Sequence, residues 1–199
     1  MNYKIKNVTN ETELDKVLEF NRNVFNLSPE TEISADYTRE AWISRIENYG
    51  EWMLYTEADE EVIGIVFGRV GGENSVTVGP VATDIRFRKQ GIAAALMAEL
   101  EKRVFSRGYH YLALGSAENA EGFYLKCGFT ASLLIQDKHP VTLDDLRGLN
   151  TGYNEAWCYD DGTDVRLCLL TNGIDRALQH LYDRTFPGCS TQTLMGKHI

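Results

Sequence analysis

Residues 86–95 read RFRKQGIAAA, and this stretch governs how the rest of the chain is interpreted. Three basic side chains, Arg86, Arg88 and Lys89, stand directly before Gly91 and a run of alanines. The first N–H groups of a helix lack internal partners and lie at the positive end of the helix dipole. Small residues let an anion reach those donors, and nearby arginine or lysine adds charge. The stretch therefore predicts a phosphate site at a helix start or, as the alternative, a tight strand-to-helix turn with solvated arginines.

The residues that follow favour a helix over 91–107. An apolar residue recurs at every fourth position, at Ile92, Leu96, Leu100 and Val104, and Gly108 stands just past the end. Other phosphate-binding folds fit less well. The chain has no GxxxxGK[ST] loop, and no GxGxxG opens its first strand-helix unit.

Composition sets the broad class of the protein. The 199 residues are 43% hydrophobic and 11% aromatic, which predicts one globular domain or one domain with an appendage. The formal net charge of -9 argues against a nucleic-acid or polyanion binder. It mildly favours a cationic partner, with plain solubility as the alternative reading.

Cysteine spacing and hydropathy indicate the compartment. The four cysteines never form a CxxC pair, so neither a zinc site nor a disulfide framework is expected, and no other metal is predicted. The polar start MNYKIKNVTNETELD lacks an apolar signal core, and no apolar run is long enough to span a bilayer. We expect a soluble cytoplasmic protein that binds neither membranes nor nucleic acid.

Changes in hydrophobic period outline a mixed α/β fold. Asn10 with Glu13 resembles a capping box at the first helix, and a linker containing Pro29 follows that helix. Pro80 beside Gly79 predicts an edge, a bulge or a break in pairing, because proline cannot donate to a strand ladder. The predicted order through residue 137 is strand 3–9, helix 11–25, helix 35–49, strands 51–57, 61–70 and 75–84, helix 91–107, strand 110–116, a short helix ending within 123–129, and strand 129–136. Gly128 suits a left-handed cap at the end of that short helix.

Two motifs in this order resemble the GNAT superfamily of acyl-CoA-dependent N-acyltransferases. RKQGIA at 88–93 matches the family's [QR]xxGx[GA] pyrophosphate loop, and SAENAEGFYLKCGF at 116–129 resembles the later segment that ends in Tyr-x-x-x-Gly-Phe. GPVATDIRF at 79–87 resembles the fourth strand, whose bulge splays the sheet open. The resemblance covers about residues 50–137 and implies a splayed central sheet flanked by helices. Ile85 stands where relatives often have proline.

The resemblance also implies which residues bind acetyl-CoA. The backbone of Val81, Ala82 and Thr83 would pair with the pantetheine arm and polarise the thioester carbonyl. Asn119 would hydrogen-bond the arm from its other side, and Tyr124 would face the sulfur. The pyrophosphate would be bound by backbone amides around Gln90, Gly91, Ala93 and Ala94, with Arg88 or Lys89 nearby.

Tyr124 suits protonation of the leaving thiolate. A phenol of pKa ~10 stays protonated at neutral pH, whereas a free thiol has a pKa of ~8.5, so proton donation is only mildly uphill. Taken alone, Tyr124 also reads as a core aromatic beside Phe123 and Phe129. Direct transfer is expected, because no cysteine is paired with a histidine as a nucleophile.

The residue that would deprotonate the acceptor amine is harder to assign. For an amine of pKa ~10.4, the neutral form lies about 4.6 kcal/mol uphill at pH 7, so a base should help. No motif singles out a base among five candidates: Glu51, Glu57, Asp84, His110 and Glu118. The first two helices also carry residues that suit a cationic amine or, equally, a solvated face: Glu19, Glu40, Glu47, Trp42 and Tyr49.

Residues 138–199 form a C-terminal extension beyond the acetyltransferase core at 1–137. We predict a short helix capped at Thr142 and then a β-β-α-β segment with a turn at Asp161-Gly162. The stretch at 165–186 echoes 111–129 as strand, polar loop, helix, tyrosine and phenylalanine, which indicates either a partial second lobe or a chance similarity. Other roles for the extension are to complete the sheet, to shape the acceptor pocket or to form a homodimer contact.

The sequence therefore predicts an N-acetyltransferase that moves an acetyl group from acetyl-CoA directly to a primary amine of a small molecule or peptide. The alternative is a non-catalytic module that binds and senses acyl-CoA. Tyr124 argues against the sensor. The residues do not identify the acceptor.

Overall fold

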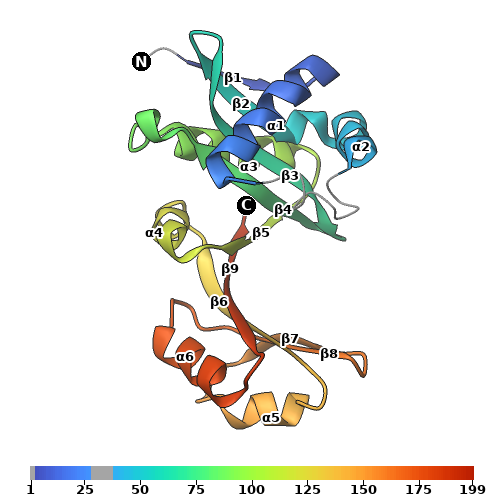
Figure 1. Cartoon of the computed structure of the whole chain (residues 1–199), viewed down its shortest axis with the longest axis vertical. Coiled ribbons are helices and arrows are strands. Elements are labelled where there is room, and N and C mark those ends of the chain that lie inside the picture. Colours follow the sequence, from blue (N-terminus) through green and yellow to red (C-terminus); the bar gives the residue numbers. More distant parts are fainter. Residues whose placement is uncertain (1–2, 28–37) are drawn as a thin grey trace. The chain divides into compact units, whose positions relative to one another are not determined.

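The computed structural model describes residues 3–27 and 38–199, coloured along the chain in Figure 1. The chain divides into two compact units. The first unit contains the residues up to Leu112 together with His198–Ile199, and the second contains Ala113–Lys197. The linker with Pro29 and the predicted helix start at 35–37 lie outside the described residues.

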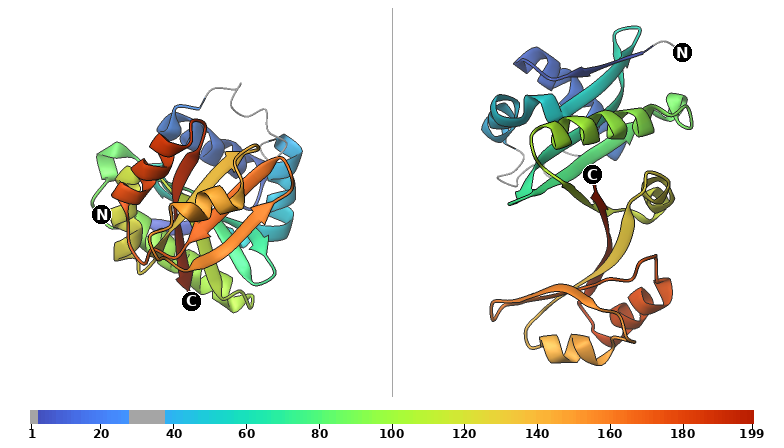
Figure 2. Two further views of the ribbon diagram at one scale, coloured as in Figure 1. Left: turned by 90° about the horizontal axis from the view of Figure 1, so that it is seen from below. Right: turned by 180° about the vertical axis from the view of Figure 1, so that it is seen from behind.

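The first unit is an antiparallel sheet between helices. In this sheet β2 pairs with both β1 and β3, and β3 pairs with β4. Helices α1 and α2 cover one face and α3 covers the other (Figures 1 and 2). The elements are β1 Lys4–Asn7, α1 Glu11–Phe25, α2 Arg39–Tyr49, β2 Met53–Ala58, β3 Glu61–Gly72, β4 Ser75–Thr83 and α3 Ile92–Ser106, with 3-10 turns at Gly50–Trp52 and Ile85–Phe87.

The first turn of α1 is capped, but one of its two hydrogen bonds differs from those of the predicted capping box. Asn10 Oδ1 accepts from Glu13 N at 3.0 Å, as predicted. The Glu13 carboxylate, however, accepts from the N–H and the hydroxyl of Thr9, at 2.8 and 2.7 Å. Thr9 offers two donors to one carboxylate oxygen, so the return bond reaches one residue beyond Asn10.

Two glycines of β3 let α3 approach the sheet closely. A Cβ on Gly64 would lie 2.8 Å from a methyl group of Ile92, and one on Gly68 would lie 3.3 Å from a methyl group of Leu100. Both glycines lie on the face that α3 covers. The backbone of β3 therefore fixes the height of α3 above the sheet, including its first turn.

The predicted irregularity at Pro80 is present as a bulge between β3 and β4. Gly68 pairs with Val78, but Val66 pairs with Val81, so Gly79 and Pro80 together lie opposite one residue of β3. Gly79 has φ 150°, in a region that favours glycine. The bulge changes the local direction of β4 just before Val81–Thr83.

The second unit has a sheet whose strand order differs from the chain order. Its strands run β5-β9-β6-β8-β7, so β9 lies between β5 and β6. A Cβ on Gly115 of β5 would lie 2.4 Å from the amide end of the Gln192 side chain of β9, so a larger residue would require that side chain to move. The elements are β5 Tyr111–Ser116, α4 Glu118–Lys126, β6 Thr130–Lys138, α5 Leu143–Gly148, β7 Glu155–Asp160, β8 Asp164–Leu169, α6 Arg176–Thr185 and β9 Ser190–His198.

Two segments of this unit share one strand-helix-strand layout: β5-α4-β6 and β8-α6-β9. Tyr124 is the seventh residue of α4, and Tyr182 is the seventh residue of α6. Both side chains are buried. The sequence echo between 111–129 and 165–186 thus corresponds to two segments of like architecture, whatever their origin.

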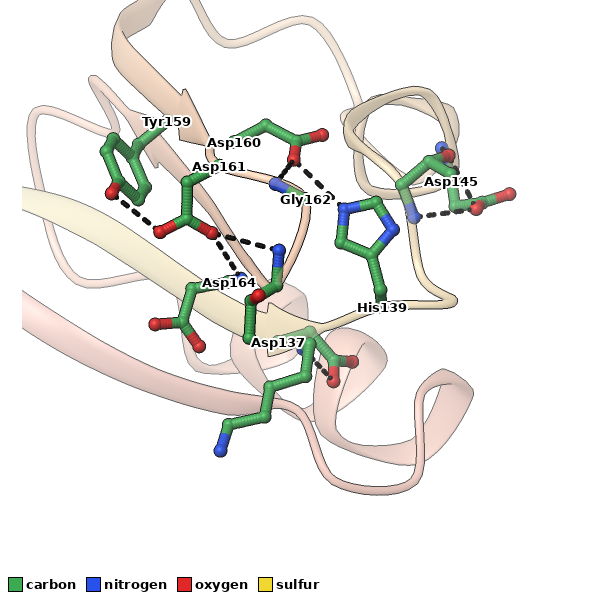
Figure 3. A network of polar contacts seen from close by, with 11 residues as sticks. Asp137, His139, Asp145, Tyr159, Asp160, Asp161, Gly162 and Asp164 are labelled. Carbon is green, nitrogen blue, oxygen red and sulfur yellow. Dashed lines mark hydrogen bonds and ion pairs between the residues drawn. The ribbon is translucent and has the colours of Figure 1, made fainter.

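The turn between β7 and β8 is held by its own aspartates (Figure 3). Asp161 accepts from the N–H groups of Thr163 and Asp164 and from the Tyr159 hydroxyl, all within 2.9 Å. The two backbone hydrogen bonds are the main cause that lowers the pKa of Asp161 to about 2. Asp160 accepts from Gly162 N and lies 2.9 Å from His139 Nε2. These carboxylates therefore stabilise the hairpin.

The structure confirms the mixed α/β class and the predicted order of elements. One difference concerns Glu51 and Trp52, which belong to a 3-10 turn rather than to β2. In this turn the Trp52 ring stacks on Tyr49 at a centroid distance of 5.4 Å, and that packing offsets the strand propensity of tryptophan. Within the described residues, no helix is both long and apolar enough to cross a membrane.

Candidate active site

The start of α3 leaves its backbone donors open. Gly91 precedes the helix with φ 82°, and no side chain caps the first turn. The first helical hydrogen bond runs from Ala95 N to Gly91 O at 2.9 Å, so the N–H groups of Ile92, Ala93 and Ala94 lack helical partners. A Cβ placed on Gly91 would meet no atom of the described residues within 4 Å. This turn can therefore accept an anion.

Four of the other described α-helices close their first turns with a side chain. Asn10, Thr38, Thr142 and Asp175 cap α1, α2, α5 and α6 in this way. Helix α4 resembles α3, because Ala117 precedes it and provides no cap. The two uncapped starts belong to the two helices in which the sequence predicts site residues.

The basic residues before α3 divide into paired and available ones. Arg86 is bound to Asp84 and Glu61, each at 2.8 Å, so its charge is already neutralised. Arg88 Nε donates to Thr83 O at 3.2 Å. Lys89 is exposed with φ 61°, and its ammonium group has no ion pair within the part of the chain that is described. Lys89 and Arg88 are thus the cations nearest to the open turn in sequence.

The end of β4 presents backbone groups on the edge away from β3. Asp84 N donates to Ile63 O at 2.9 Å, so the pair of Ala82 with Ile65 is also hydrogen-bonded in the alternating ladder. By the same alternation, the N–H groups of Val81 and Thr83 point away from β3. Of the three predicted residues, these two have donors that can bind an extended ligand.

A cavity of about 620 Å³ lies beside this strand end in the first unit. It is lined by α1, by the start of β3 and by the segment that leads into α3. Glu19 lines it, as do Asp84 and Arg88. This volume falls within the range of roughly 300–1,000 Å³ that is usual for small-ligand sites.

In the second unit, Tyr124 is buried on the inner face of α4. Its side chain is 7% exposed, and the Phe129 ring lies 5.8 Å away in an edge contact. Its hydroxyl donates to no acceptor in the described residues. Burial, with a smaller effect of Cys127, raises the pKa of Tyr124 to about 12. The phenol is therefore protonated throughout the neutral range.

The C-terminal end of α4 fixes the position of Tyr124. Gly128 has φ 85°, and Phe129 N donates back to Tyr124 O at 3.1 Å, which confirms the predicted left-handed helix ending. Lys197 of β9 donates to Cys127 O at 2.8 Å, at the negative end of the helix dipole. Asn119 lies at the other end of α4, exposed in its first turn.

Comparison with known proteins identifies the family. The model of the acetyltransferase (GNAT) family matches residues 15–129, more than half of the chain. This protein belongs to the GNAT acetyltransferase family. Acetyl-CoA-dependent acetyl transfer is the general reaction of that family. The matched residues span α1 to the end of α4, so they include both uncapped helix starts.

Solved structures share the fold of this GNAT protein at low sequence identity. PaiA N-acetyltransferase from Thermoplasma acidophilum, solved in complex with coenzyme A, is 18% identical with a TM-score of 0.55; the alignment covers 85% of this chain and 99% of that one. An N-acetyltransferase from Staphylococcus aureus Mu50 is 18% identical with a TM-score of 0.54, covering 85% and 98%. No curated protein matches the chain.

None of the five candidate bases of this GNAT protein stands out. Asp84 is bonded to Arg86, which lowers the pKa of its carboxyl and weakens it as a base. Three other carboxylates also have cationic neighbours: Glu51 is bonded to Arg107, Glu57 to Lys6, and Glu118 lies 3.6 Å from Arg176. His110 packs against the Phe105 ring. The structure therefore names no base.

The predicted acceptor aromatics are engaged within the first unit. Trp42 is 4% exposed, and its ring is covered by the guanidinium of Arg45 at 4.3 Å. Tyr49 stacks on Trp52. Their faces are used for packing, which leaves Glu19 as the acceptor candidate that lines the cavity.

The sequence analysis did not single out Glu121, one turn before Tyr124 on the same buried face of α4. Glu121 is 3% exposed, and its Oε2 is bonded to Arg176 of α6. The spacing of three residues from Tyr124 was the available signal. The predicted site residues fall into two groups: 81–94 lie together in the first unit, and Asn119 and Tyr124 lie on α4 in the second.

Proposed function

We propose that this protein transfers an acetyl group from acetyl-CoA directly to a primary amine of a small molecule or peptide. The uncapped first turn of α3, with open space above Gly91, carries the proposal. That turn fits a pyrophosphate, because its N–H groups, dipole and bare backbone all suit an anion. Arg88 and Lys89 would add charge beside it.

The strand end after the bulge would bind the pantetheine arm. The N–H groups of Val81 and Thr83 face away from β3 and can pair with amide groups of the arm. An N–H donor at the thioester carbonyl would stabilise the negative charge that develops on its oxygen. We assign this role to the backbone of 81–83, as the family resemblance implies.

For α4, the family resemblance implies a hydrogen bond from Asn119 to the pantetheine arm and a place for Tyr124 facing the sulfur. In the reaction, the amine nitrogen forms a bond to the acyl carbon, the carbon–sulfur bond breaks, and the amine loses a proton. Complete proton transfer from a phenol of pKa about 12 to a thiolate of pKa ~8.5 is uphill by about 5 kcal/mol. We therefore assign Tyr124 a hydrogen bond to the departing sulfur, which costs less free energy than full protonation.

The proposal also assigns a role to each of two parts of the chain, residues 1–137 and residues 138–199. Residues 1–137 would form the acetyltransferase core, in keeping with the family match at 15–129. Residues 138–199 would be an extension that completes the sheet or forms a small partial second lobe. The β-β-α-β order of that extension follows α5 in the structure.

A charge placed at the start of α3 tests the proposal. Gly91→Glu puts a carboxylate at the anion site, and like charges about 4 Å apart repel by about 4 kcal/mol near a protein surface, on the order of a thousandfold in affinity. Gly91→Ala is the matched control, because it has the same backbone strain without the charge. Coenzyme A affinity is measured by calorimetry, and turnover is measured with acetyl-CoA and a panel of primary amines.

We expect the glutamate variant to lose coenzyme A binding and the alanine variant to keep most of it. Equal affinity in both variants would place the pyrophosphate elsewhere and overturn the proposal. Tight binding by the wild-type protein without acetylation of any amine would instead favour the non-catalytic sensor.

A further inference from the structure

A second cavity, of about 450 Å³, lies wholly within the second unit. Its walls are formed by the end of β5, the N-terminal half of α4, helix α6, Gln136 of β6 and the start of β9. The residues that line it are of polar type except Ala117, and they include Glu118 and Glu121 from α4, Arg176 and Gln179 from α6, and Gln192 from β9. A small hydrophilic ligand suits such a lining better than an apolar one.

The carboxylate of Glu121 is the unusual group in this cavity. The side chain lines the cavity and is only 3% exposed. Its Oε2 is bonded to Arg176, but its buried Oε1 has no hydrogen-bond partner in the described residues. Buried carboxylate oxygens in proteins are nearly always paired, because an unpaired one loses the hydration it had in water. This oxygen therefore calls for a donor that the described residues do not supply.

Arg176 is the one arginine among the described residues that line the cavity, and it is already occupied by neighbouring acceptors. Its guanidinium donates to Glu121 and to Gln179 Oε1, and it lies 3.6 Å from Glu118 Oε1. Gln179 in turn donates to Thr193 Oγ1 at 3.0 Å. Arg176 thus has little capacity left for an external anion, and the arrangement does not suit a phosphate or a carboxylate ligand.

The charge balance of the lining points to a cation. Within the described part of the chain, the carboxylates of Glu118, Glu121 and Asp183 line the cavity together with Arg176 and His180. Asp183 accepts from the Thr191 hydroxyl at 3.1 Å. A protonated amine would supply both the positive charge and the N–H donor that Glu121 lacks.

We propose that this cavity binds the protonated primary amine of a small organic molecule, with Glu121 as its counter-ion. Two sources have this chemistry: the acyl acceptor, if the proposed acetyl transfer is correct, or a separate ligand that is not acetylated. Binding itself does not depend on acetyl transfer, so it can be measured without acetyl-CoA.

Cadaverine, a linear diamine, is the probe, and the pentanediol of the same chain length is its uncharged control. Calorimetry on the full chain should show binding of cadaverine and none of the diol. Since a hydrogen bond to a charged group contributes roughly 1.5–3 kcal/mol, Glu121→Gln should weaken binding by at least about tenfold. Glu73→Gln removes the same charge from the exposed β3–β4 turn and should leave the affinity unchanged.

A second variant covers the case in which Glu121→Gln fails to fold. Ser190→Trp, at the exposed first residue of β9, fills the cavity without removing Glu121 or Arg176 and should abolish binding. No cadaverine binding by the wild-type protein, equal binding of the diol, or unchanged affinity in both cavity variants would overturn the proposal. The last result would mean that water alone occupies the cavity.

Addition of acetyl-CoA distinguishes the two sources of the amine. Acetylated cadaverine that appears with the wild-type protein and declines with Glu121→Gln identifies the cavity as the acceptor site. Binding without acetylation of cadaverine, while other amines are acetylated, identifies a separate ligand site. If no amine at all is acetylated but cadaverine still binds, the proposed function fails and this inference stands.

Discussion

Helices α4 and α6 occupy equivalent places in two similar strand-helix-strand segments, but they differ in whether their polar groups have hydrogen-bond partners. Each follows a strand, precedes another and places a buried tyrosine at its seventh residue. In α6, Asp175 caps the first turn, and the Tyr182 hydroxyl donates to Leu146 O at 2.7 Å. In α4, the first turn has no side-chain cap, and the Tyr124 hydroxyl has no acceptor within the described residues.

The difference shows where to look for function in a repeated architecture. In α6, the polar groups are used to stabilise the fold: a cap, a buried hydroxyl and a packed ring. In α4, the equivalent groups have no such partners among the described residues. We interpret α4 as the functional member of the pair and α6 as the structural one, and each prediction below tests that assignment.

Removal of the Tyr124 hydroxyl should lower catalysis, whereas removal of the Tyr182 hydroxyl should lower stability. The change in catalysis should be the largest of the expected effects. Tyr124→Phe should lower kcat by roughly 10- to 100-fold, because a hydrogen bond to a charged group contributes roughly 1.5–3 kcal/mol, while coenzyme A affinity stays unchanged. Tyr182→Phe should leave kcat within a factor of two or three. Steady-state kinetics on both variants measure kcat, and calorimetry measures coenzyme A affinity. Equal kcat values for the two variants would contradict the functional assignment of α4.

The pH dependence of stability is the next largest effect. Burial raises the pKa of both Tyr124 and Tyr182 to about 12, against ~10 in an unfolded chain. A raised pKa means that the folded state holds the proton more tightly, so the stabilisation is complete below pH ~10 and is lost as pH rises through ~12. We expect the free energy of unfolding to fall by about 3 kcal/mol for each tyrosine over that window.

Phenylalanine variants sharpen the pH experiment. Tyr182→Phe should flatten the fall between pH 10 and 12, and at neutral pH it should cost about 1–3 kcal/mol, because the carbonyl of Leu146 loses its donor. Tyr3→Phe, near the start of β1, serves as the control and should reproduce the wild-type slope. Urea unfolding at a series of pH values provides the measurement, and a Tyr182→Phe curve parallel to the wild type would contradict the assignment.

Substitutions at the capping positions of α4 and α6 should have the smallest effect, a change in stability. Asp175→Ala removes the cap of α6 and should cost about 1 kcal/mol of stability. Ala117→Ser supplies a hydroxyl at the equivalent position of α4, where the extended backbone suits a cap, and should add up to about 1 kcal/mol. Thermal unfolding of both variants checks the signs. Destabilisation by Ala117→Ser would mean that the α4 start is already satisfied.

Local chemistry made much of the fold predictable. The bulge at Pro80, the helix ending at Gly128 and the open start at Gly91 each depend on backbone rules for one or two residues, and all three are present. Thr142 likewise caps α5 as predicted, with Asp145 completing the capping box. These features are encoded within a few neighbouring positions, so the sequence alone indicates them.

The remainder of the site depends on contacts between distant segments. The ion pair of Glu121 with Arg176 joins positions 55 residues apart, and no periodicity in either helix reveals it. The covering of the Trp42 ring by Arg45 depends on side-chain rotamers, so a candidate ligand platform became a packing residue. Sequence patterns locate the helices of such a site more readily than the partners of their side chains.

The place of β9 between β5 and β6 has a consequence for how the second unit is assembled. Residues 190–198 fill a slot between strands that come much earlier in the chain, with the segment from α5 to α6 intervening. Until they arrive, one edge of β6 has unpaired backbone groups that can recruit any extended peptide. During folding, the same slot can accept the equivalent strand of a second copy, so strand exchange and aggregation compete with correct closure.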